Sequence, residues 1–263
     1  MRRMTGFGFA TITVLALGFA APSAEANGIV YIGQDSSDHF GSQPQGVTLT
    51  KNAVIWAGGT ATPSIGLVGD GVSFGGNTQA LLNAAGFAGE YTLIAPSALG
   101  STVLSLYDLL YFAPTTSSAD TAFFAASSAS IASYTAGGGG LVVEPEVFAA
   151  GSWAWVPDAA LIGHTDGTNI CGTAPANAVT IVTPGDPVMA GLTDAGLSNW
   201  GCSIHSEFAT PGAAGYTTLA AATGGPADII SKEAVPEPMS LMLLGTGLVV
   251  AAYRARRKGA NQA

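Results

Sequence analysis

Two glutamates, Glu144 and Glu146, follow the apolar segment 141–143 with a single residue between them. Side chains two positions apart on a strand point to the same face of a sheet, so a strand that continued to Glu146 would present both carboxylates together. Such a pair can act as general acid and general base on a glycan, and open α/β sheets bind ligands at the carboxyl ends of their strands. Pro145 opposes a continued strand, and the alternative is two strand-end carboxylates in water.

A second acidic group follows an earlier apolar segment. Asp35, Asp38 and His39 come just after residues 29–32, and carboxylates beside an imidazole can hold a cation. The alternative is an ordinary turn. The three histidines of the chain are widely separated, and its two cysteines are too few for a structural zinc site. We therefore predict no cofactor and keep Asp35 and Asp38 as the candidate metal ligands.

Alternating strands and helices must position these residues. Apolar runs predict strands at residues 29–32, 54–57, 91–95, 108–113, 141–144, 179–182, 203–208 and 217–222. Periodic segments predict helices at residues 77–85 and 118–134. This alternation is typical of βαβ units, in which helices cover both faces of a mostly parallel sheet. The sequence therefore predicts an α/β fold in three layers.

Both predicted helices have recognisable features. Asn77 suits an N-cap and Gly86 suits the position after the last turn. The second helix places four side chains on one face: Phe123, Ser127, Ile131 and Tyr134. Glycines 137–140 then end it, and the stretch 58–76, rich in Gly, Thr and Ser, predicts a surface insertion.

Positive charge is concentrated at the two ends of the chain. Only Lys51 and Lys232 lie between residues 27 and 235, against fifteen Asp and Glu residues, which gives this region a formal charge of −13. Such a domain repels nucleic acid and anionic lipid. A divalent cation or a neutral polysaccharide suits it better as a partner, and the alternative is that the charge serves solubility alone.

The amino terminus has the three parts of a secretory signal peptide. Arg2 and Arg3 supply the positive start, residues 7–21 are apolar, and Ala24-Glu25-Ala26 gives the A-x-A cleavage pattern. We predict a signal peptide over residues 1–26 that uses the general secretory route and leaves Asn27 first.

The carboxyl terminus also has three parts. It begins with a short motif made of Val235, Pro236, Glu237 and Pro238. An apolar run follows at residues 239–253, and its length of about 22 Å falls short of a ~30 Å hydrocarbon core. A basic cluster then closes the segment: Arg254, Arg256, Arg257 and Lys258. Because basic clusters stay in the cytoplasm, this run predicts a single membrane helix with the acidic domain, residues 27–234, outside.

These three parts in this order, over residues 235–259, resemble the PEP-CTERM sorting signal, which is also called the ice-binding protein C-terminal domain. The resemblance implies that an exosortase, a transpeptidase-like membrane protease, recognises Pro236, Glu237 and Pro238 and cleaves nearby. It implies export through the secretion machinery, an inner-membrane intermediate, and a final place at the cell surface or in the extracellular matrix. Bacteria with such substrates make exopolysaccharide and biofilm.

For an exported chain, an even number of cysteines predicts a disulfide. Cys171 and Cys202 would close a loop of about thirty residues, which chain-entropy estimates value at about 3–4 kcal/mol. The alternative is two buried thiols.

A second resemblance covers residues 77–222, through the segments LLNAAGF at 81–87, YDLLY at 107–111, YTAGGGGLVV at 134–143 and PGDPVMAGL at 184–192. These are similar to the class I glutamine amidotransferase-like superfamily with its ThuA-like branch, which implies a flavodoxin-like fold. Its catalytic members use a cysteine at a strand-to-helix elbow and a later His-x-Glu. His205 and Glu207 have that spacing, but Glu144-Pro145-Glu146 stands at the elbow and a carboxylate does not replace a thiolate.

Three functions follow from this reading. The first is a non-catalytic, surface-sorted domain that binds exopolysaccharide. Trp153, Trp155 and Trp200 could stack on its sugar rings or pack inside the domain. The second is a hydrolase of envelope or exopolysaccharide material that uses Glu144, Glu146 or His205. The third is an ice-associated protein, although the chain has no regular Thr-x-Thr ladder.

Overall fold

The computed structural model describes residues 27–69, 77–115, 117–144, 153–165, 170–171 and 177–233. The predicted signal peptide, the sorting segment with its predicted membrane helix, and Glu146 lie outside these ranges. Among the described residues, no helix has both the length and the apolar character needed to span a bilayer.

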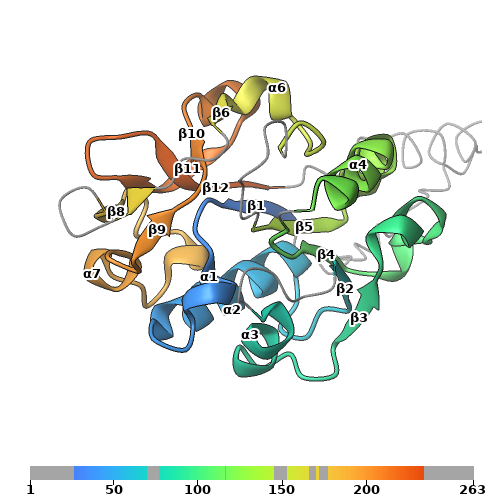
Figure 1. Ribbon diagram of the computed structural model, residues 1–263, viewed down its shortest axis with the longest axis horizontal. Coiled ribbons are helices and arrows are strands. Elements are labelled where there is room, and N and C mark those ends of the chain that lie inside the picture. The colour runs from blue at the N-terminus through green and yellow to red at the C-terminus, as the bar shows by residue number, and fades with distance from the viewer. Residues whose placement is uncertain are drawn as a thin grey trace, which may run out of the picture.

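In the described part of the chain, ten strands form one sheet, whose arrangement Figure 1 shows. They are β1 (Gly28–Ile32), β2 (Ile65–Val68), β3 (Tyr91–Ile94), β4 (Leu109–Phe112), β5 (Gly140–Val143), β6 (His164–Thr165), β8 (Val179–Ile181), β10 (Glu207–Phe208), β11 (Thr217–Ala222) and β12 (Ala227–Glu233). Two further strands, β7 (Ile170–Cys171) and β9 (Cys202–Ile204), form a separate antiparallel pair.

The large sheet is mixed, and the prediction of a mostly parallel sheet is therefore wrong. Its main path runs β3-β2-β4-β5-β1-β12-β10-β6, and only the pairs from β3 to β1 are parallel. The pairs that involve β12, β11, β10, β8 and β6 are antiparallel. No strand was predicted at β12, which returns from β11 through a short turn. Such a turn can join only antiparallel strands.

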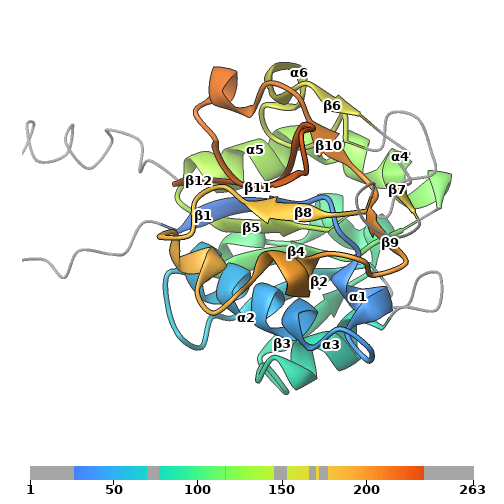
Figure 2. The ribbon, with the colours of Figure 1, turned by 90° about the vertical axis from the view of Figure 1, so that its left-hand side faces the viewer.

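Helices cover both faces of the sheet, which confirms the layered α/β architecture. Figure 2 shows α1, α2 and α3 on one side of the strands and α4, α5 and α6 on the other. The α-helices are α1 (Ser36–His39), α2 (Pro44–Gly58), α3 (Thr78–Ala84), α4 (Ser118–Ala126), α5 (Ser128–Ala136), α6 (Ala159–Ile162) and α7 (Asp194–Leu197). Short 3-10 helices are η1 (Pro96–Ser101), η2 (Leu104–Leu106), η3 (Pro187–Met189) and η4 (Pro211–Ala214).

The parallel strands are buried on both faces, as their continuous apolar runs predict. Along β1, Val30 and Ile32 face the core under α2, whereas Ile29 and Tyr31 face the core on the other side. All five residues of β1 are buried. The sheet thus separates two apolar cores, and β1 contributes to both.

Two further predictions are wrong, and the first fails because a short apolar run does not distinguish a strand from a helix. Residues 54–57 form the last turns of α2, whose buried face carries Leu49, Ala53 and Ala57 at helical spacing. Pro44 at its start and Gly59 in the left-handed region at its end bound this helix. The stretch 58–76 is not wholly a surface insertion, since β2 within it is fully buried.

The long helix predicted at residues 118–134 is divided in two at Ser127. The predicted buried face is wrong at Phe123, which is 41% exposed while Phe124 is buried, and is confirmed at Ser127, which is 5% exposed. Ile131 keeps its predicted place in the core. The cap of α3 is confirmed: Asn77 accepts a hydrogen bond from the Ala80 amide at 2.8 Å, and Gly86 has a φ of 99°.

The carboxyl ends of β1 and β5 lie side by side and send the chain to opposite faces of the sheet. After β1 the chain enters α1, which lies on the α2 side, and after β5 it reaches α6 on the α5 side (Figure 2). Such a switch point is where open α/β sheets leave room for a ligand. Asp35 and Glu144 follow these two strands.

Candidate functional site

Three side chains from two distant parts of the chain meet at this switch point. Asp35 lies between β1 and α1, His39 is the last residue of α1, and His205 lies between β9 and β10. The Nε2 atom of His39 is 3.4 Å from one carboxylate oxygen of Asp35, and the Nε2 atom of His205 is 3.0 Å from the other. Asp35 and His205 are buried, while the side chain of His39 is 24% exposed. We call these three residues the edge cluster.

A close backbone approach brings His205 to this position. The amides of His205 and Ser206 both donate to the carbonyl of Gly33, at 2.7 and 3.2 Å. A Cβ atom on Gly33 would lie 2.1 Å from the Ser206 carbonyl oxygen and 2.7 Å from the Asp228 carboxylate. Only glycine therefore lets the segment before β10 cross the end of β1 at this distance.

Mutual electrostatics stabilise the charged forms within the edge cluster. Burial by itself raises the pKa of Asp35, but hydrogen bonds from His205 and His39 outweigh it and hold that pKa below its ordinary value. The same hydrogen bond to Asp35 raises the pKa of His39. Burial, helped by the charge of Asp35, raises the pKa of Asp38.

Glu144 lies next to this cluster and is fully buried, which excludes for it the alternative of a strand-end carboxylate in water. It accepts hydrogen bonds from the Ser37 amide and from the Tyr111 hydroxyl. Burial raises the pKa of Glu144 to about 7, although the hydrogen bond from Tyr111 opposes this change. Glu144 thus links β4, β5 and the first turn of α1.

The other sequence candidates fall elsewhere. Glu146 lies outside the described residues, so its pairing with Glu144 stays a prediction. Glu207 belongs to β10 opposite Thr165, and burial raises its pKa, but it does not join the edge cluster. Trp153, Trp155 and Trp200 are all buried in the apolar cores, which leaves no face on which a sugar could stack.

The two cysteines occupy opposite positions of a two-stranded sheet. Cys171 of β7 and Cys202 of β9 are backbone partners in an antiparallel register. Partners of this kind have Cα atoms about 4.5–5.5 Å apart, which lies within the range of about 4.4–6.8 Å that a disulfide spans. The disulfide stays a prediction, with a backbone placement that suits it.

We expect the exported protein to contain no reactive thiol until it is reduced. Alkylation without reductant should leave its mass unchanged, and alkylation after reduction and unfolding should add two groups. Reduction should also lower the free energy of unfolding by about 3 kcal/mol, because the closed loop restricts the unfolded chain. Labelling of both cysteines in the unreduced, unfolded protein would contradict the expectation.

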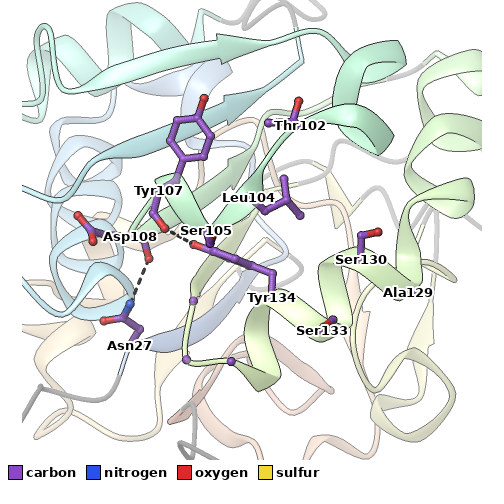
Figure 3. Close-up of a pocket in the computed structure, with 13 residues that line it drawn as sticks. Asn27, Thr102, Leu104, Ser105, Tyr107, Asp108, Ala129, Ser130, Ser133 and Tyr134 are labelled. Atoms are coloured by element: carbon purple, nitrogen blue, oxygen red, sulfur yellow. Dashed lines mark hydrogen bonds between the residues drawn. The ribbon is translucent and has the colours of Figure 1, made fainter.

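A separate open groove of about 680 Å³ lies at the opposite, amino edge of the parallel strands (Figure 3). It is bounded by the segment before β1, by η2 with the start of β4, and by α5 with the glycines before β5. Its polar lining comes from Asn27, Thr102, Ser105, Tyr107, Asp108, Ser130, Ser133 and Tyr134. Two contacts fix its floor: the Tyr134 hydroxyl donates to the Tyr107 carbonyl at 3.1 Å, and the Asn27 amide donates to the Asp108 carbonyl at 3.2 Å.

Sequence reasoning found Asp35 and placed the glutamate at the strand end, but it did not join His39 to His205. These histidines are far apart in the chain, and only the return of the chain to β1 through the β9–β10 segment brings them together. The groove was missed because it is made of single polar residues on three segments that lie far apart in the chain. No spacing in the sequence marks such a set.

Comparison with known proteins gives one match, to the carboxyl-terminal segment. Residues 234–258 match the family described as the PEP-CTERM protein-sorting motif. No curated protein and no solved structure matches the chain, so the resemblance of the middle domain to the amidotransferase-like superfamily is not supported. The chain therefore carries a sorting motif of exosortase substrates, which supports an exported protein directed to the cell surface.

Proposed function

We propose that this chain is a matrix-binding protein of the bacterial surface, sorted by an exosortase, whose domain binds neutral exopolysaccharide in the groove at the amino edge of the sheet. The observation that carries the proposal is the lining of the groove: hydroxyl, amide and peptide groups surround an open volume of about 680 Å³. The sorting motif supports the proposal, because a protein directed to the cell surface would encounter exopolysaccharide there.

The chemistry of the lining suits a polyhydroxylated, uncharged ligand. Hydroxyls such as those of Ser105, Ser130 and Ser133 both donate and accept, so they can match the hydroxyls of a sugar in either sense. Tyr107 and Tyr134 add partly exposed rings of the kind that pack against sugar faces. The backbone at Gly137 and Gly138 lets a ligand approach closely because neither residue carries a side chain, whereas the ring of Tyr134 packs against Gly139.

The charge of the groove and of the domain favours an uncharged ligand over an acidic one. The groove contains one carboxylate, Asp108, whose oxygen accepts from the Ser64 amide and hydroxyl at 2.9 Å each. No lysine or arginine is among the residues that line it. An acidic polysaccharide would be repelled by this carboxylate and by the negative domain around it, so a neutral glycan is favoured.

If the glycan binds in the groove, a bulky side chain placed there should weaken glycan binding. Ser133→Trp, on the exposed wall formed by α5, is expected to weaken binding of a neutral glycan at least tenfold, because the indole would occupy the volume of a sugar ring. The measurement is co-sedimentation and microcalorimetry with two probes: dextran, and the neutral polysaccharide fraction from cultures of the producing bacterium.

Ala132→Trp is the matched control, because Ala132 is exposed on the same helix but does not line the groove. It should bind as the unaltered protein does. Equal binding by both variants, or no binding of either probe by the unaltered protein, would exclude the groove as a glycan site.

The hydrolase alternative draws less support from the geometry. A general acid must reach the glycosidic oxygen, and Glu144 is fully buried under Tyr111 and α1. His205 is also buried and faces Asp35. The ice-associated alternative depends on the second name of the sorting segment alone.

A further inference from the structure

We propose that the edge cluster of Asp35, His39 and His205 is a binding site for a divalent transition-metal ion of the zinc type. The site lies at the carboxyl edge of the parallel strands, away from the groove, and is independent of glycan binding. Two imidazole nitrogens and one carboxylate form the ligand set. The ion would tie the first helix of the domain to the segment between β9 and β10.

The spacing of the three groups supports coordination. One ligand atom from each residue can be chosen so that all three lie within 4.8 Å of one another. The two histidine nitrogens face different oxygens of the same carboxylate, at 3.4 and 3.0 Å. Zinc bonds of about 2.0–2.2 Å in a tetrahedron separate neighbouring ligand atoms by about 3.3–3.5 Å. Only small movements of the side chains would therefore be needed to close the site around an ion.

The donor types select the class of metal. Imidazole nitrogen suits zinc, copper, nickel and iron, whereas calcium and magnesium prefer an all-oxygen shell. Two of the three groups here are histidines. The partial exposure of His39 leaves one side open to solvent, so water can complete the coordination.

The basic side chains of the domain leave the carboxylate of the cluster to the histidines. Residues 27–233 contain two basic side chains other than histidine: Lys51, which is exposed on α2, and Lys232, which pairs with Asp158 at 2.8 Å. The ion pairs described for Asp35 are those with His39 and His205. No ammonium group therefore competes with a metal ion for this carboxylate.

The surrounding contacts already hold the ligands in place. The Gly33 carbonyl fixes the backbone of His205, and the carboxylate of Glu144 fixes the amide of Ser37 in the turn that carries Asp35 and His39. Ligands supported in this way lose little freedom when an ion binds. The three ligands therefore lie close to their binding positions before an ion binds.

The test is metal titration of the exported protein after removal of metal with a chelator. Zn²⁺ and Co²⁺ are the probes, followed by microcalorimetry and by the visible absorption of bound Co²⁺. One ion per chain should bind with micromolar affinity or better and should raise the thermal midpoint, because it binds the folded state alone. Ca²⁺ and Mg²⁺ should bind at least a hundredfold more weakly.

His39→Ala is the informative variant, because this side chain is the most exposed of the three and its loss leaves the buried pair in place. It should weaken binding of Zn²⁺ at least tenfold while the circular dichroism spectrum stays unchanged. His164→Ala, at a partly exposed histidine of β6 outside the cluster, should bind Zn²⁺ as before. No stoichiometric binding of either ion, or equal binding by both variants, would overturn the proposal.

Discussion

Replacing Trp153 by alanine is expected to lower the free energy of unfolding by about 3–5 kcal/mol, the range typical of removing a large buried aromatic side chain. The ring is fully buried and packs edge-on against Tyr31 and Phe208, with ring centroids 5.3 and 5.0 Å away. Its Nε1 atom donates to the Ser206 hydroxyl at 2.8 Å. The loss would therefore combine a cavity, two aromatic contacts and an unpaired hydroxyl, and denaturant titration at constant pH measures it.

Two further variants separate packing from hydrogen bonding at this position. Trp153→Phe keeps much of the apolar volume and loses the donor, so it should cost about half as much or less. Leu106→Ala, at a side chain that is 71% exposed, should change stability by less than about 0.5 kcal/mol. A Trp153→Ala protein as stable as the unaltered one would mean that this ring is not part of the core.

The stability of the unaltered protein should fall by about 2–3 kcal/mol between pH 5 and pH 8 through Glu144 alone, because a tenfold change in proton affinity on folding corresponds to about 1.4 kcal/mol. The pKa of Glu144 rises from an ordinary value of 4.5 to about 7 on folding, so the folded protein holds the proton more tightly than the unfolded chain. The contribution is complete below about pH 4.5 and is lost as the pH rises through about 7.

Glu144→Gln should remove this part of the pH dependence, since an amide of the same shape does not ionise. Its oxygen can accept from the Ser37 amide, and its NH2 group can donate to the Tyr111 hydroxyl oxygen. Denaturant titrations at several pH values, with a chelator present throughout, give the slope for each protein. Glu90→Gln serves as the control, because Glu90 is exposed before β3 and the same substitution there should leave the slope unchanged. An identical slope in the Glu144→Gln and unaltered proteins would show that Glu144 stays ionised when buried.

Local signals in the sequence predicted much of the fold. The cap at Asn77, the glycine turn after α5 and the buried runs of β1, β4 and β5 each depend on neighbouring residues, and the structure confirms them. Residues 54–57 were assigned wrongly because a run of four apolar residues fits a helix end as well as a strand. The parallel character of the sheet was overestimated because β12 was not predicted, and β12 sets the direction of the second half.

The candidate sites depend on contacts that local signals do not contain. Asp35 was identified from its acidic neighbourhood, but its burial and its contact with His205 follow from the path of the chain across the end of β1. Glu144 was placed correctly at a strand end. Its burial was not predicted, because Tyr111 and the first turn of α1, which cover it, come from other parts of the chain. A contact between residues that are separated by most of a domain can be predicted only when the order of the strands is known.

The position of β1 has a consequence for export. Its two neighbours in the sheet are β5, more than a hundred residues later, and β12, the last described strand, in whose register Gly28 faces Glu233. The first strand of the domain thus pairs with a strand from its far end. Contacts so distant along the chain slow folding. A chain exported in the unfolded state would therefore complete this sheet only after β12 had crossed the membrane.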